Sequence, residues 1–206
     1  MPEPALGVVK ADHPSAEDYV CASWLLLCEV AALRAVGEVE AGPAGAFLDT
    51  GEPVILFERH HFDRLTKGRF RGAKVPDAPA GATWSVISWP QGGGYGPTSA
   101  QHRRLAAAAQ LDREAALSSA SWGLFQIMAS NHRAAGYSTV QRFVTAAYRS
   151  ATDHLRMLTM FLRADERLVD AIRDKDWETF AGIYNGPKFA ENSYDTRLAA
   201  AYRKFS

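Results

Sequence analysis

Glu40 occupies a position where a carboxylic acid can act as a proton donor. Residues 29–41 have the pattern of a helix, and on a helical wheel Glu40 falls between Leu33 and Val36 on the apolar face. Apolar surroundings disfavour the charged form of a carboxyl group, so its pKa should rise. An acid that keeps its proton near neutral pH can donate it to a leaving oxygen. A partly buried glutamate bonded to loop amides fits the same pattern.

Glu38 is expected on the opposite side of the same helix. It follows Arg34 by one turn, so an exposed ion pair of little energetic weight is expected there. The helix should end at Gly42-Pro43, because glycine can adopt the left-handed C-terminal conformation and proline cannot continue a helix. The sequence therefore places two nearby glutamates in different environments.

The elements that must position these groups are predicted to be mainly helical. A first helix should begin at the capping-box spacing of residues 15–18, ahead of the apolar run 19–27. Ser138 with Gln141 has similar spacing, and Asp176 is followed by Glu178 in a first turn. The other expected helices comprise residues 29–41, 99–111, 112–119, 138–148, 152–164, 166–172, 176–184 and 194–204.

One small β-hairpin is expected among the helices. Residues 46–48 and 53–58 predict two short strands around the turn Asp49-Thr50-Gly51. Residues 67–98 are rich in glycine and proline and should form a long surface loop, of a kind that often carries function. The predicted fold class is mainly α (α+β), in one domain over residues 1–206 with residues 1–14 as a loose lead-in.

Composition and charge exclude several classes of protein. Among 206 residues, 23 are Lys or Arg and 23 are Asp or Glu, so no positive field attracts nucleic acid. The apolar run 20–28 is too short to cross a bilayer, and no stable membrane association is expected. Cys21 and Cys28 would lie on the order of 10 Å apart on one helix, which is beyond disulfide reach and favours a reducing compartment. The first residues lack the features of a secretory signal, which predicts a cytoplasmic location.

The sequence indicates no cofactor and no metal site. His60 and His61 are adjacent and are expected to point apart, and no His-Glu-x-x-His or cysteine cluster occurs. The glycine-rich run at 92–96 lacks the Lys-Ser/Thr pair of a phosphate loop, and no Gly-x-Ser-x-Gly elbow is found. Zinc peptidases, nucleotide-binding proteins and serine hydrolases are therefore disfavoured.

Three segments resemble, in order, the signatures of the lysozyme-like superfamily of goose-type lysozymes and lytic transglycosylases. They are Val39-Glu40-Ala41-Gly42, Ala120-Ser121-Trp122-Gly123-Leu124-Phe125-Gln126-Ile127-Met128 and Ile183-Tyr184-Asn185-Gly186-Pro187. A closer resemblance, to the N-acetylmuramidase domain of bacteriophage endolysins, spans residues 29–202. It adds Ile55-Leu56-Phe57-Glu58-Arg59-His60, Gly93-Gly94-Tyr95-Gly96 and Trp177.

The resemblance implies a lysozyme-like helical domain with the hairpin beside an active-site cleft. It implies hydrolysis of the β-1,4 bond between N-acetylmuramic acid and N-acetylglucosamine in bacterial peptidoglycan, with Glu40 as the general acid. If no group positions a water, the 6-hydroxyl of the substrate can attack instead, which gives the anhydro product of a lytic transglycosylase. A wall-binding protein without turnover is a further alternative.

Glu58 is the candidate for the second catalytic role. A glycosidase needs a group that stabilises an oxocarbenium-like centre or activates water on the other face of the sugar. Alternation along the strand 53–58 places Glu58 at the strand end, near a cleft rim. A salt bridge to Arg59 or Arg64, or a cap on a helix that begins near His60, explains Glu58 equally well.

Five polar or aromatic side chains are candidates for substrate binding: Ser121, Gln126, Tyr184, Asn185 and Tyr95. Each has a structural alternative, such as hydrogen bonding to neighbouring backbone, capping of a helix end or filling of a surface hollow. The large apolar residues of the same segments are expected in the core instead; these are Trp122, Leu124, Phe125 and Ile127.

An endolysin-like enzyme without a secretory signal is expected to wait in the host bacterial cytoplasm. A holin-type opening of the membrane would then release it to the cell wall, although an injected effector fits equally well. We expect a monomer that has peptidoglycan as its partner and no additional wall-binding module.

Overall fold

The computed structural model describes residues 11–187 and 189–206, so most of the predicted lead-in lies outside the described residues. The mainly α prediction is confirmed. The α-helices are α1 (Ala16–Leu26), α2 (Val30–Glu40), α3 (Arg59–Leu65), α4 (Gln101–Leu111), α5 (Arg113–Ser118), α6 (Val140–Ala147), α7 (Ala151–Arg163), α8 (Glu166–Asp174), α9 (Trp177–Tyr184) and α10 (Tyr194–Phe205). The strands are β1 (Ile55–Phe57), β2 (Ala120–Trp122) and β3 (Ile127–Met128).

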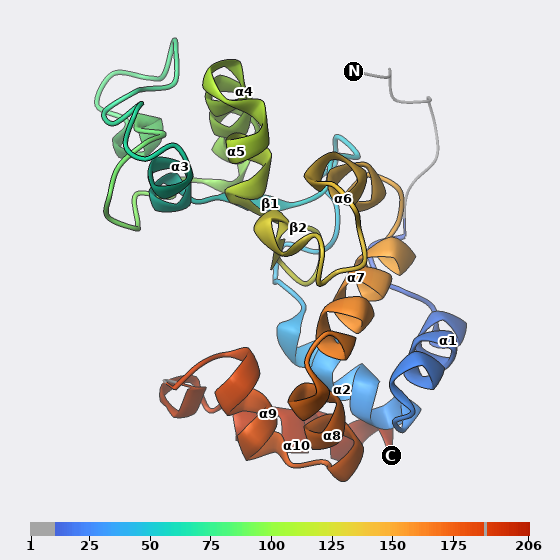
Figure 1. Cartoon of the computed structure of the whole chain (residues 1–206). Helices are drawn as coiled ribbons and strands as arrows, with labels where there is room; N and C mark the ends of the chain where they lie inside the picture. The colour runs from blue at the N-terminus through green and yellow to red at the C-terminus, as the bar shows by residue number, and fades with distance from the viewer. Residues whose placement is uncertain (1–10, 188) are drawn as a thin grey trace.

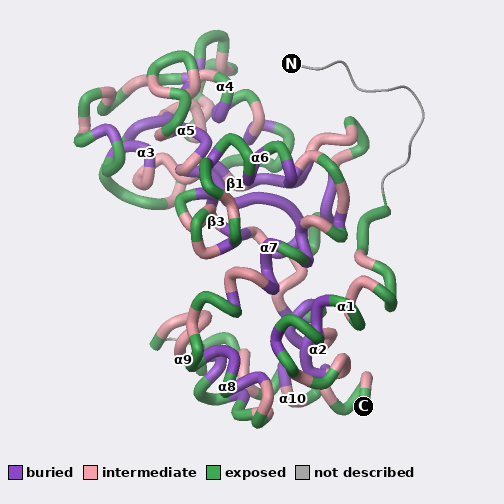
Figure 2. Tube along the Cα trace, turned by 45° about the vertical axis from the view of Figure 1, so that its right-hand side comes forward, coloured by how far each residue is buried: buried purple, intermediate pink, exposed green. Residues whose placement is uncertain are grey.

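The chain forms two lobes joined by a narrower waist (Figure 1). The sheet lies in one lobe with α3, α4, α5 and α6, and the other lobe contains α2, α8, α9 and α10. In this second lobe α10 packs along α2, and α9 packs on α8 and α10. Helix α7 runs from the first lobe toward the second, and α1 packs along it. Buried positions continue through both lobes (Figure 2), so one hydrophobic core connects them.

Local capping explains where several helices begin. Ser15 and Asp18 form the predicted capping box at the start of α1, and Asp176 accepts a hydrogen bond from the Thr179 N–H at the start of α9. The predicted cap at Ser138 is wrong by one residue. Thr139 is the N-cap of α6, because its hydroxyl accepts from the Arg142 N–H.

The strand partners differ from the predicted hairpin. The strand at 55–57 is confirmed, but it pairs antiparallel with β2, which pairs antiparallel with β3. The segment 46–48 pairs only with residues 52–54, through a bridge between Phe47 and Pro53 that is flanked by two backbone hydrogen bonds. The Leu48 N–H donates to the Glu52 carbonyl at 2.8 Å, and the Val54 N–H donates to the Ala46 carbonyl at 3.0 Å. The predicted turn is therefore present, and the β2–β3 connection in the segment 120–128 forms a second hairpin.

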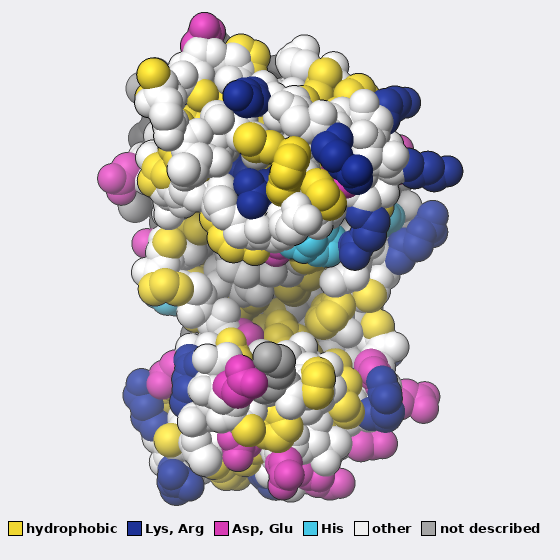
Figure 3. All heavy atoms as spheres, turned by 90° about the vertical axis from the view of Figure 1, so that its left-hand side faces the viewer, with side chains coloured by type: hydrophobic (Ala, Val, Ile, Leu, Met, Phe, Trp, Pro, Cys, Tyr) yellow, Lys and Arg dark blue, Asp and Glu magenta, His cyan; other side chains and the backbone are white. Residues whose placement is uncertain are grey.

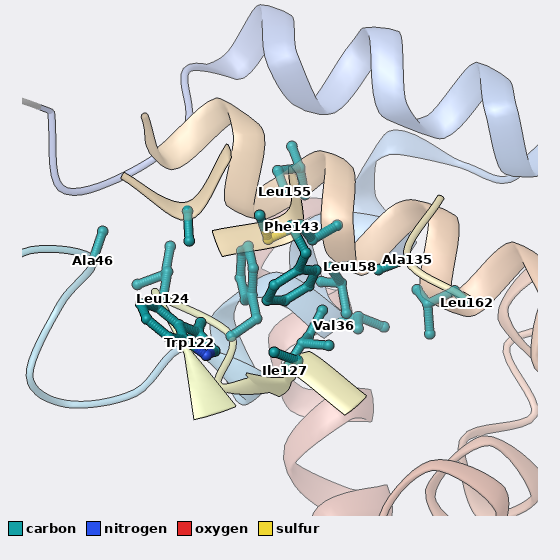
Figure 4. Packing of buried hydrophobic residues seen from close by; sticks show 14 of the residues in the cluster. Val36, Ala46, Trp122, Leu124, Ile127, Ala135, Phe143, Leu155, Leu158 and Leu162 are labelled. Atoms are coloured by element: carbon teal, nitrogen blue, oxygen red, sulfur yellow. The ribbon is translucent and has the colours of Figure 1, made fainter. Parts of the chain in front are cut away.

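This segment enters the core as predicted. Trp122, Leu124, Phe125 and Ile127 are at most 6% exposed. In Figure 4, Trp122, Leu124 and Ile127 converge with Val36 of α2 and with residues of α6 and α7, and Phe125 belongs to the same cluster. Each such side chain contributes about 1.5–3 kcal/mol on burial. The segment 120–128 consequently fixes the sheet against α2.

The connection at 67–98 is longer and better anchored than a simple surface loop. It contains a bridge between Lys74 and Val86, and Val75 and Ile87 are buried.

Cys21 and Cys28 are free thiols, as expected from their separation. Among the described residues, no single helix is long and apolar enough to span a membrane; α1 and α2 meet such a test only as a pair bent by 110°.

Candidate active site

Glu40 is the last residue of α2, and contacts with the segment 120–128 fix this helix end. Ala41 leaves the helix in an extended conformation, and the Gly42 N–H donates to the carbonyl of Leu124 at 2.8 Å. Gly42 does not adopt the left-handed conformation expected from the sequence, because pairing with the turn after β2 ends the helix instead. The end of α2 is thereby tied to the sheet lobe.

The carboxyl group of Glu40 contacts Asn185, which follows α9. Asn185 Nδ2 donates to Glu40 Oε1 at 3.3 Å, so two of the motifs recognised in the sequence meet in space. Burial raises the pKa of Glu40, while the Asn185 hydrogen bond and the nearby Arg197 guanidinium oppose the rise. Desolvation is the larger effect. The arrangement therefore shifts the carboxyl group toward its protonated form, which can serve as a proton donor.

Glu38, on the same helix, has an exposed side chain as predicted. Its partner is Lys204 of α10, with 2.6 Å between Lys204 Nζ and Glu38 Oε2, rather than the expected Arg34. The Arg34 guanidinium instead lies over the ring of Phe205, 4.1 Å from its centroid. The last turn of α10 packs against α2 and supplies both partners, which a pattern within one helix does not show.

Tyr184 and Asn185 lie together beside Glu40. The Tyr184 ring stacks on Phe180 and meets Phe161 edge-on, and burial together with the nearby Glu40 raises the pKa of its hydroxyl. Asn185 Oδ1 is buried and accepts no hydrogen bond from the described residues. The amide thus faces Glu40 with its donor and keeps an acceptor for another group.

Ser121 and Gln126 hold the strand-to-turn geometry next to the end of α2. The Ser121 hydroxyl donates to Gln126 Oε1 at 2.8 Å, and Gln126 Nε2 donates to the carbonyls of Gly123 and Val54 at 2.7 and 3.3 Å. Ser121 is 5% exposed, and Gln126 has a φ of +48°. The structural alternative raised from the sequence is therefore present in the molecule, because both side chains fix the turn whose Leu124 carbonyl accepts from the Gly42 N–H.

Glu58 lies in the sheet lobe, at the junction of β1 and α3. Its backbone is the N-cap of α3, but its carboxylate makes no capping hydrogen bond and instead lies 3.3 Å from His60 Nδ1. Arg59 and Arg64, the partners considered from the sequence, are bonded elsewhere: Arg59 to the carbonyls of residues 91 and 92, and Arg64 to His61 Nδ1. The side chain that faces the Glu58 carboxylate is thus a histidine.

His60 and His61 do not point apart, contrary to the prediction from their adjacency. Their ring centroids are 4.4 Å apart in an edge contact. One possible ligand atom from each of Glu58, His60 and His61 lies within 4.8 Å of the others. Among the described residues, this cluster has the composition that can hold a metal ion.

Tyr95 is held by two side chains that the sequence analysis did not single out. Gln101 Nε2 and Arg104 Nη1 both donate to the Tyr95 carbonyl, at 2.6 and 2.7 Å. Gln101 Oε1 also accepts from the N–H of Phe57 in β1 at 3.0 Å. Both side chains are buried. The sequence pattern could have indicated them, because Gln101 and Arg104 share a helical face with Leu105, and a polar side chain buried there needs a hydrogen-bond partner.

A hollow crosses one face of the molecule between the two lobes, with histidine side chains on its upper margin (Figure 3). α3, which carries His60 and His61, is on this side of the upper lobe, and α9 is on this side of the lower lobe (Figure 1). The candidate residues thus fall into two groups. Glu40, Tyr184 and Asn185 belong to the junction of α2 and α9, whereas Glu58 and Tyr95 belong to the sheet lobe.

Comparison with known proteins gives consistent results. Residues 29–206 match the family model described as N-acetylmuramidase. Among solved structures, the chain is similar to the Burkholderia AP3 phage endolysin, with 36% sequence identity, a TM-score of 0.82, and coverage of 98% of this chain and 74% of that chain. No curated protein matches the chain.

Proposed function

Because the chain belongs to the N-acetylmuramidase family and is a peptidoglycan-degrading endolysin, we propose that Glu40 is the general acid of its glycosidase reaction. The bond cleaved is the β-1,4 bond between N-acetylmuramic acid and N-acetylglucosamine. Glu40 donates its proton to the bridging oxygen as the bond from this oxygen to the sugar C1 breaks.

The contact between Asn185 Nδ2 and Glu40 Oε1 carries this proposal. It places an amide donor against a carboxyl group whose pKa is raised by burial. In the reactant state the carboxyl group holds a proton, and after donation the amide hydrogen bond stabilises the carboxylate that forms. Glu38, which is exposed and paired with Lys204, lacks these conditions.

Glu58 is proposed to take the second role. Its carboxylate accepts a proton from a water molecule that adds to C1, so that the product is a reducing muramic acid. The side chain is 19% exposed and lies at the junction of β1 and α3, where it is accessible without being fully solvated. His60 lies beside this carboxylate, with its Nδ1 3.3 Å from Glu58 Oε2.

The remaining candidates are proposed to contact the sugars. Asn185 Oδ1 offers a buried acceptor to a sugar hydroxyl or an N-acetyl N–H, and Tyr184 lies beside it. Tyr95, on a loop anchored by buried side chains, offers a ring for stacking. Ser121 and Gln126 contribute mainly by fixing the turn that pairs with Gly42, and Gln126 is the more exposed of the two.

We propose further that the protein acts as a monomer on bacterial peptidoglycan and neither binds nucleic acid nor associates stably with a membrane. Its equal numbers of basic and acidic residues agree with this. We place it in the host bacterial cytoplasm until a holin-type opening gives access to the wall. Size-exclusion chromatography with light scattering tests the monomer, and fractionation of expressing cells tests the location.

The experiment for Glu40 is mass spectrometry of borohydride-reduced muropeptides released from purified peptidoglycan. The wild type should give reducible muramic ends, and Glu40→Gln should lower the rate by about 10²- to 10⁴-fold, the usual contribution of a general acid. Glu38→Gln is the matched control and should retain activity. Equal activity of Glu40→Gln and the wild type would refute the assignment.

The products also distinguish the other reactions. Anhydromuramic ends would make the enzyme a lytic transglycosylase and leave Glu58 without its role. Wall binding without any glycan product would indicate a binding protein. Reducible glucosamine ends would indicate a different glycosidic bond.

A further inference from the structure

We propose that Glu58, His60 and His61 form a binding site for a divalent transition-metal ion of the zinc type. The three residues occupy the N-cap and first turn of α3. The Glu58 N–H donates to the carbonyl of Ser119 at 2.9 Å, which fixes the start of this helix against the residue that precedes β2. The three side chains therefore project from an anchored backbone rather than from a free loop.

The distances suit a small cation. Glu58 Oε2 and His60 Nδ1 are 3.3 Å apart. Two ligands of a tetrahedral zinc ion with bonds of about 2.0–2.2 Å are separated by about 3.3–3.5 Å. The third ligand atom, from His61, lies within 4.8 Å of both. A change of the His61 rotamer can bring this third atom to the ligand spacing.

The His60 ring also has a buried nitrogen without a hydrogen-bond partner among the described residues. Its Nδ1 is buried, and its contact with Glu58 is too poorly aligned to be a hydrogen bond. A buried polar atom without a partner is unfavourable, and a metal ion that shares Glu58 and His60 would satisfy both groups. Two imidazoles and one carboxylate form a donor set suited to zinc, nickel or copper, whereas calcium and magnesium prefer oxygen ligands throughout.

Arg64 weakens the expected affinity of this site for a metal ion. Its Nη2 lies 2.7 Å from His61 Nδ1, so the guanidinium occupies that lone pair and adds positive charge beside the site. The side chain is exposed and can move away, but its charge lowers metal affinity. Arg64→Ala should therefore bind the metal more tightly than the wild type. General damage to the fold would weaken binding instead, so this result distinguishes a metal site from a structural effect.

Occupation of the site should inhibit the enzyme, and this part rests on the proposed role of Glu58. A carboxylate that binds a cation is no longer free to accept a proton from water. The metal would then act as a reversible inhibitor, removed by a chelator.

The test is isothermal titration of chelator-treated protein with zinc chloride, with cobalt chloride as a spectroscopic substitute. His61→Ala should weaken binding at least about tenfold, since even outer-shell changes cost about 10- to 100-fold at metal sites. Arg64→Ala should tighten binding at least about threefold. His102→Ala is the matched control, because His102 also faces a carboxylate, with its Nδ1 3.7 Å from Glu52 Oε1. It should leave affinity unchanged.

The titration is repeated in the Glu40→Gln background, so that binding is measured independently of activity. Absence of zinc binding, or equal affinity in wild type and His61→Ala, would overturn the site. Loss of the visible cobalt band in both His61→Ala and His61→Gln supports the site. Two variants are used so that misfolding of one of them cannot by itself explain the loss. Binding without inhibition would retain the site and remove the role of Glu58, while an inactive wild type that binds zinc would count against the proposed function alone.

Discussion

Replacement of Asn185 by leucine should shift the pH dependence of the enzyme upward. Leucine approximates the shape of asparagine, so it keeps Glu40 shielded from water while it removes the Nδ2 donor. That hydrogen bond lowers the pKa of Glu40 and partly offsets the rise due to burial. Without it, the pKa of Glu40 rises further. The acid must be protonated to act, so activity should persist to higher pH.

The size of the shift follows from the length of the hydrogen bond. A well-formed hydrogen bond to a charged group contributes about 1.5–3 kcal/mol. At 3.3 Å the contact is slightly long, so we assign it about 1 kcal/mol. Since one pKa unit corresponds to about 1.36 kcal/mol, the alkaline limb should move upward by about 0.7 pH unit.

The measurement is kcat/KM as a function of pH with a soluble peptidoglycan oligomer, because this quantity reports the essential groups of the free enzyme. Glu38→Gln serves as the control and should leave the limb in place, since that carboxylate is exposed and paired with Lys204. A loss of amplitude in Asn185→Leu without movement of the alkaline limb would make Asn185 a substrate contact only. A downward movement would refute the role assigned to Glu40.

Further predictions concern stability. Folding raises the pKa of Glu40, so the folded state is destabilised when this carboxyl group is charged. Glu40→Gln removes that charge and should therefore raise the Tm at pH 7. Below the ordinary glutamate pKa of 4.5 the wild-type group is protonated in both states, so the two Tm values should converge. Gln101→Leu leaves a buried N–H of β1 without its acceptor and removes one donor from the Tyr95 carbonyl, so urea denaturation should show a loss of about 2 kcal/mol and limited proteolysis should cut the connection at 67–98 sooner. Gly123→Ala should destabilise by about 2–5 kcal/mol in the same assay, because Gly123 has a φ of +71° and a Cβ there would lie 2.6 Å from the His154 ring. Unchanged urea midpoints would contradict the last two predictions.

The helices could be predicted because their signals are local. Ser15 with Asp18 and Asp176 with the first turn of α9 determine helix starts by contacts within a few residues. The orientation of Glu40 also followed from one helix, since Leu33 and Val36 are buried on the same face. The error at Ser138 was of the same local kind, because two adjacent hydroxyl residues competed for one cap.

The sheet could not be predicted in this way. The segment 53–58 has an apolar pattern that specifies a strand but not its partner. Residues 55–57 pair with β2, far along the chain, while only residues 52–54 pair with the nearby segment 46–48. Pairing with β2 buries Ile55 and Phe57 against the core, which a local hairpin does not achieve. Likewise, adjacency of His60 and His61 suggested divergence, whereas their rings meet edge-on and Arg64, one turn further along α3, bonds to His61 Nδ1.

The difference between Glu38 and Glu40 shows which part of the chain controls the proposed acid. Both residues are on α2, and helical periodicity alone separates their directions. What surrounds them comes from α9 and α10, which supply Asn185 to Glu40 and Lys204 to Glu38. Arg197 of α10 adds a donor to the Val39 carbonyl at 3.3 Å, and its charge moderates the pKa of Glu40. The strength of the acid is therefore set by α10, which packs along α2, and by the end of α9, which supplies Asn185. Substitutions in α10 can change the pH dependence without touching a substrate.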